Sequence, residues 1–130
     1  MKNLRNIIAV LFVSLVTFGT TFATNDDNEE ISRLRQTVEN ASSSDWQVYA
    51  NAAERCVELK TNLSEAYIWI ETAIQIEPNA SNLELKADYL AANSANEMAI
   101  EAYRTAILKG ISEDGYDVQE AQRKMLSLLR

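Results

Sequence analysis

The chain has 130 residues, enough for one domain, with 12 Lys or Arg, 19 Asp or Glu, no histidine and a single cysteine, Cys56. The acidic balance argues against binding to nucleic acid or to anionic membrane surfaces, and the lack of histidine excludes histidine-based triads and histidine zinc sites. One cysteine makes no internal disulfide, so we expect a fold held by packing, with Cys56 buried rather than joining two chains.

Residues 1–23 are typical of a secretory signal peptide. Lys2 and Arg5 precede an apolar run from Ile7 to Phe18, and small and hydroxyl residues follow up to Ala23. The run is shorter than the roughly 20 apolar residues of a spanning helix, which favours cleavage after Ala23 over a retained anchor. We expect an exported protein, periplasmic or extracellular, without stable membrane insertion after cleavage. Loss of Lys2 and Arg5 leaves 10 basic and 19 acidic residues, a net charge of −9.

Six helices are expected after a flexible lead at 24–28. An N-terminal helix and linker occupy 29–44, and the next helix runs from 45 to 59. Pro78 ends the third helix because proline lacks the amide that the next turn requires. The remaining helices begin near 81, 94 and 117. Apolar residues recur at three- and four-residue steps, and no stretch alternates with period two over strand length, so the sequence predicts an all-α fold.

Helix boundaries carry recognisable signals. Residues with capping potential stand three positions before Gln or Glu, which is capping-box spacing. These residues are Ser44, Asn62, Ser81, Ser94 and Asp117. Gly110 stands where a helix C-cap favours a residue that tolerates positive φ.

The third and fifth helices repeat one another at an offset of 33 residues. The corresponding pairs are Ala66 and Ala99, Ile70 and Tyr103, Ala73 and Ala106, and Ile74 and Ile107. Alanines seven residues apart lie on the same helix face, where a neighbouring helix can approach closely. We therefore expect Ala73 and Ala106 at helix–helix contacts.

This pattern resembles the tetratricopeptide repeat, whose second helix reads A-x₃-[aromatic or apolar]-x₂-A-x₄-P. The matching residues are Ala66, Ile70, Ala73 and Pro78 in the first unit, and Ala99, Tyr103 and Ala106 in the second, where Ile111 replaces the proline. The first-helix pattern is matched by Tyr49, Ala53 and Cys56, and then by Leu83, Ala87 and Leu90. The resemblance implies a short α-solenoid of two helical hairpins, repeat 1 at 45–79 and repeat 2 at 80–111, flanked by the N-terminal helix and a C-terminal capping helix at 112–130.

Residues 45–110 are also similar to the helical tail found behind a small β-domain of unknown function in exported bacterial proteins. The features in common are the A-A-x-x-C run at 52–56, "NLSEA" at 62–66 and "IEPN" at 76–79. No β-domain precedes the tail in this sequence, so no activity of that domain is inferred.

The tetratricopeptide resemblance implies that the inner face of the first helices binds a peptide or protein. Mapped onto this chain, the candidate ligand-binding residues are Gln47, Asn51, Glu54, Glu58, Leu85 and Asp88, with Ala92 beside them. A solvated helix face is the alternative interpretation of the same residues. Glu54, Glu58 and Asp88 on one side would repel one another, and a basic peptide would relieve that repulsion.

These observations predict an exported, non-enzymatic interaction module with no cofactor and no metal. The alternative is a structural, self-associating helical module of an envelope assembly that docks through its end helices. An enzyme is disfavoured because two stacked hairpins offer no enclosed pocket that would raise the pKa of a carboxylate. "SEDGYD" at 112–117 lacks EF-hand spacing and is interpreted as a loop that starts a helix.

Trp69 has two interpretations, a partner-binding aromatic or a residue packed against the N-terminal helix. Packing is favoured, because the apolar stripe of Ile31, Leu34 and Val38 otherwise has no partner.

Overall fold

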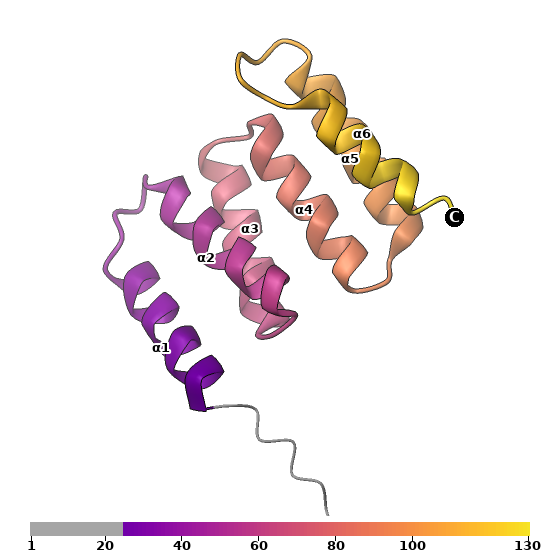
Figure 1. Ribbon diagram of the computed structural model, residues 1–130. Helices are drawn as coiled ribbons and strands as arrows, with labels where there is room; N and C mark the ends of the chain where they lie inside the picture. Colours follow the sequence, from indigo (N-terminus) through magenta and orange to yellow (C-terminus); the bar gives the residue numbers. More distant parts are fainter. Residues whose placement is uncertain (1–24) are drawn as a thin grey trace, which may run out of the picture.

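The computed structural model describes residues 25–130, which form six α-helices and no strand (Figure 1). The helices are α1 (Asn25–Glu39), α2 (Trp46–Leu59), α3 (Leu63–Ile76), α4 (Ala80–Ala92), α5 (Asn96–Gly110) and α6 (Val118–Ser127). The all-α prediction is confirmed. The predicted signal peptide at 1–23 lies outside the described residues.

Each helix packs against its neighbour in the sequence, most extensively α2 against α3 and α4 against α5. Helices α2 and α4 also contact one another, and α6 lies along α5 at the C-terminal end (Figure 1). Short connections between amphipathic helices produce this arrangement, since each helix buries its apolar stripe on the next one in the chain.

Three of the four pairs related by the 33-residue offset are closely matched in burial, whereas Ile74 is half-buried and Ile107 is buried. Ala66 and Ala99 are 0% exposed, and so are Ala73 and Ala106. The larger residues between these alanines, Ile70 and Tyr103, are 1% and 3% exposed. The side chain of alanine ends at its methyl group, so a neighbouring helix can approach closely at these positions. The prediction that Ala73 and Ala106 lie at helix–helix contacts is confirmed.

Helix α1 begins at Asn25, so the flexible lead predicted at 24–28 is wrong from residue 25 onward. Acidic residues near a helix N-terminus interact favourably with the helix dipole, and Glu29 forms an ion pair with Arg33 one turn later. Two further arginine–carboxylate pairs join α1 to its neighbours. Arg55 of α2 binds Glu30 at 2.5 Å, and Arg35 binds Glu65 of α3 at 2.7 Å.

The apolar stripe of α1 contributes to the core formed by α2 and α3. Ile31 is 6% exposed, and Leu34 and Val38 pack on the same cluster. Trp69 belongs to this cluster and is 7% exposed. The packing interpretation of Trp69 is therefore confirmed. Cys56 is a free, fully buried thiol of the same core, as predicted, and burial raises its pKa.

Only one predicted cap forms the bond expected of it: the Asp117 side chain accepts from the Glu120 amide at 3.0 Å. Helix α4 is capped by Asn79, which accepts from the Asn82 amide at 2.8 Å, and not by Ser81.

The other three predicted caps make no capping bond. Ser44 precedes the N-cap position by one residue and hydrogen-bonds Ser42 instead. Asn62 and Ser94 have φ values of 51° and 60°. A left-handed residue terminates the preceding helix, whereas a side-chain N-cap requires extended backbone, so the preceding helix determines their conformation.

Gly110 is the last residue of α5 and has no positive φ, so its predicted role as a C-cap is wrong. The glycine is buried against Tyr116, and a Cβ added there would overlap the aromatic ring. Close packing is thus the reason for a glycine here. The left-handed glycine of this region is Gly115, with φ of 84°.

Candidate functional site

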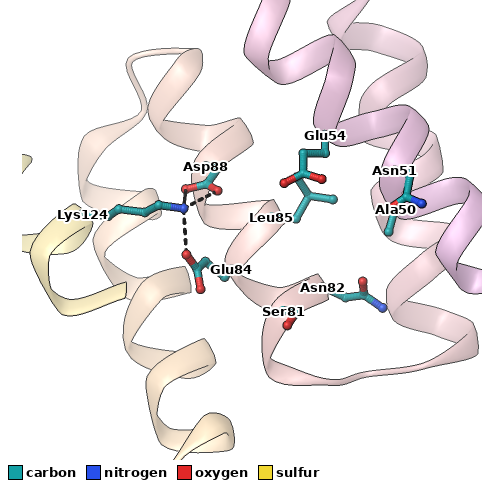
Figure 2. A pocket seen from close by; sticks show the side chains of 9 residues that line it. All are labelled: Ala50, Asn51, Glu54, Ser81, Asn82, Glu84, Leu85, Asp88 and Lys124. Carbon is teal, nitrogen blue, oxygen red and sulfur yellow. Dashed lines mark hydrogen bonds and ion pairs between the residues drawn. The ribbon is translucent and has the colours of Figure 1, made fainter. Parts of the chain in front are cut away.

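A hollow with a volume of about 260 Å³ lies between α2 and α4, and α6 contributes one residue to its wall (Figure 2). The lining residues are Ala50, Asn51 and Glu54 of α2, Ser81, Asn82, Glu84, Leu85 and Asp88 of α4, and Lys124 of α6. Apolar Ala50 and Leu85 are each 8% exposed, whereas the remaining wall is polar or charged.

Four of the six candidate residues predicted from the sequence line this hollow: Asn51, Glu54, Leu85 and Asp88. Gln47 is exposed on α2 and does not contribute to the wall. Glu58 lies outside the hollow as well and forms an ion pair with Arg55 at 3.0 Å.

Lys124 crosses from α6 to two carboxylates of α4 (Figure 2). Its Nζ donates to Glu84 Oε1 at 2.8 Å and to Asp88 Oδ2 at 2.9 Å. Burial acts to lower the pKa of Lys124, but the hydrogen bonds to Glu84 and Asp88 and their negative charges outweigh it, and the pKa is raised. Lys124 therefore stays protonated and neutralises part of the acidic wall.

Asp88 has a second partner, which comes from α5. The phenolic hydroxyl of Tyr103, a core residue that is 3% exposed, donates to Asp88 Oδ1. Burial, together with the hydrogen bond to Asp88, raises the pKa of Tyr103 far above the ordinary tyrosine value. Asp88 is thus held by α5 and α6 at once, and its orientation is fixed.

The prediction that Glu54, Glu58 and Asp88 repel one another as unpaired carboxylates of one groove is wrong. Asp88 is paired with Lys124, and Glu58 is paired with Arg55 outside the hollow. Glu54 forms no ion pair or hydrogen bond within residues 25–130, and its side chain is exposed at the rim. Helix spacing in the sequence predicts which acids share a side of the helices. It does not predict their basic partners, because these come from other turns and other helices.

Sequence reasoning missed five of the nine lining residues: Ala50, Ser81, Asn82, Glu84 and Lys124. Asn82 lies three positions after the asparagine of "EPN" and carries only the signal of a helix start, while Lys124 is one of several charged residues on α6. Their placement depends on how α4 meets α3 and α6, so no local spacing would have identified them.

No group of three His, Cys, Asp or Glu side chains in the described part of the chain is arranged to hold a metal ion. None of the six helices is both long enough and apolar enough to cross a membrane. Comparison with family models, with curated proteins and with solved structures gives no match to this chain. The helices themselves define an all-helical fold class.

Proposed function

We propose that this protein is an exported, non-enzymatic interaction module that binds a basic peptide or protein segment in the hollow between α2 and α4. The observation that carries the proposal is the hollow: it lies between the two helices that the repeat alignment equates, and four candidate binding residues line it. Its charged groups are three carboxylates and one ammonium, so a cationic ligand is favoured electrostatically.

A tetratricopeptide-like arrangement is part of this proposal. Two α-hairpins, α2–α3 and α4–α5, would be the repeats, with α1 and α6 as the flanking helices. Support comes from the matched burial of Ala66 with Ala99 and of Ala73 with Ala106, and from the contact between α2 and α4. In such stacks each hairpin needs a neighbour to bury its remaining apolar face.

The test is a pull-down of the exported protein from an envelope extract, followed by titration of the captured partner against wild type and a Glu54→Gln/Asp88→Asn variant. We expect the variant to bind more weakly and wild-type binding to decrease with salt, since the Debye length falls to about 3 Å at 1 M. Equal affinities would exclude the hollow as the binding site. Export is tested by intact mass: the secreted chain should begin at Thr24, and retained Met1 on membrane-bound protein would contradict cleavage.

A structural, self-associating module is the second candidate. Large apolar side chains on and just beyond the last two helices are exposed, including Leu108 at 72%, Ile111 at 69%, Leu126 at 54% and Leu129 at 64%. Self-association through this end would cover them. Light scattering over a concentration series decides this candidate: a monomer at all concentrations contradicts it, and a dimer that Leu126→Ser/Leu129→Ser dissociates supports it.

A further inference from the structure

The buried amide of Asn82 has an orientation that its neighbours determine. Asn82 is 2% exposed, and its Nδ2 donates to the carbonyl oxygens of Glu77 at 2.8 Å and of Ala73 at 3.4 Å. Both partners can only accept, so the NH₂ group must face them. The Asn82 Oδ1 atom is therefore turned the other way, into the space between α2 and α4 (Figure 2).

This oxygen has no hydrogen-bond donor among the described residues. The two bonds of the Asn82 side chain use its nitrogen, and its backbone amide donates to Asn79. The oxygen keeps contact with solvent through the hollow, which is large enough for a ligand group, so a donor of a ligand can take the place of that solvent.

Glu54 provides a second acceptor on the opposite wall. Its carboxylate lines the same hollow from α2 and has no cationic partner in the described part of the chain, whereas Glu84 and Asp88 are paired with Lys124. The acceptors left open to a ligand thus include one neutral oxygen from α4 and one charged carboxylate from α2. A group that only donates, and donates in more than one direction, matches them.

We propose that the hollow is a subsite for one arginine side chain of the partner, with Asn82 Oδ1 and Glu54 as its two acceptors. A guanidinium carries five N–H donors in a rigid plane and no acceptor, so it can bridge separated acceptors in a way that the compact lysine ammonium cannot. Lys124 limits the subsite at the far end by keeping Glu84 and Asp88 engaged. This inference rests on the proposed function and specifies the ligand chemistry of the same hollow.

The probe is a set of three capped tripeptides, acetyl-Gly-Xaa-Gly-amide, in which Xaa is arginine, citrulline or lysine. Citrulline keeps the shape of arginine but removes the charge and replaces one nitrogen with an acceptor. Each peptide is titrated into the ¹⁵N-labelled protein, with the side-chain NH₂ signals of Asn82 as the readout. We expect the arginine peptide to shift these signals and to bind more tightly than the other two.

Glu54→Gln and Glu58→Gln form a matched pair of variants. Both remove one negative charge from exposed positions of α2 one turn apart, but only Glu54 lines the hollow. Because hydrogen bonds to charged groups are roughly twice as strong as neutral ones, we expect Glu54→Gln to weaken arginine-peptide binding about three- to tenfold and Glu58→Gln to leave it within about twofold. Unchanged thermal melts verify that both variants fold.

Three outcomes overturn the inference: equal binding of arginine and citrulline peptides, equal binding of arginine and lysine peptides, or equal losses in the two variants. Failure of the proposed function looks different. If the captured partner is bound through the hollow but the arginine peptide does not move the Asn82 signals, the arginine subsite is wrong and the peptide-binding function stands. If the partner also binds wild type and the Glu54→Gln/Asp88→Asn variant with equal affinity, both the arginine subsite and the binding function of the hollow are wrong.

Discussion

Gly110→Ala tests whether packing or backbone conformation accounts for the glycine at the end of α5. A Cβ added at Gly110 would lie 2.8 Å from Tyr116 Cγ and closer still to Cδ1, so the ring must move. Such overpacking costs about 1–3 kcal/mol, and the better helix propensity of alanine offsets up to about 1 kcal/mol of it. We expect a net destabilisation of about 1 kcal/mol, measured as a lower midpoint of urea unfolding with an unchanged m-value.

The same substitution in a Tyr116→Ala background separates the two explanations. Without the ring the added methyl meets no obstacle, so Gly110→Ala should become neutral, or stabilising by up to about 1 kcal/mol. A requirement for left-handed backbone would instead give the same penalty in both backgrounds. A coupling energy near zero in this double-mutant cycle would therefore refute the packing argument.

Three further perturbations follow from the structure. Ala73→Leu and Ala106→Leu should each lower the free energy of unfolding by roughly 1–3 kcal/mol through overpacking, and unchanged melts would contradict the close helix contacts. Lys124→Met leaves two carboxylates of α4 without their counter-ion and should cost about 1–2 kcal/mol, less than for a fully buried pair because the lysine is partly solvated. The pKa of Lys124 is raised in the folded protein, so its contribution to the free energy of unfolding is complete below the unfolded pKa of about 10.4. The contribution is lost as pH rises through the folded pKa, and the difference in unfolding free energy between wild type and Lys124→Met should become smaller in that range. Burial raises the pKa of Tyr103 and Tyr116, so their tyrosinate absorbance should appear at higher pH than the ordinary value near 10. A spectroscopic titration in which all 5 tyrosines ionise together near pH 10 would contradict this.

The helices were predictable because their signals are local and repeated. Periodic apolar residues define α2 from Trp46 to Leu59, and Pro78 limits α3, so both agree closely with the sequence prediction. Side-chain caps were less predictable, because an αL residue that closes one helix can occupy the position that should start the next. Ser94 shows this competition: its φ of 60° belongs to the end of α4, and its hydroxyl caps nothing in α5.

The candidate site was only partly predictable for a different reason. Repeat alignment places Glu54 and Asp88 at equivalent positions, and both do line one hollow. Alignment does not show counter-ions, and Lys124 reaches Asp88 from 36 residues further along the chain. The sequence therefore predicts how many carboxylates lie on one face. The negative charge available to a ligand depends on which of these carboxylates already form ion pairs in the folded protein.

Asn82 illustrates the same distinction for a neutral group. In the sequence it is one more polar residue at a helix start, a position where asparagine needs no special explanation. In the structure its amide nitrogen joins α4 to the end of α3 through Glu77 and Ala73, and that structural bond is what leaves its oxygen facing the hollow. One side chain thus joins α4 to the end of α3 and leaves an acceptor at the hollow, where we propose that a ligand binds. Substitution of Asn82 would confound the two roles. Glu54 has no hydrogen-bond or ion-pair partner among residues 25–130, so its substitution is the one that separates binding from folding.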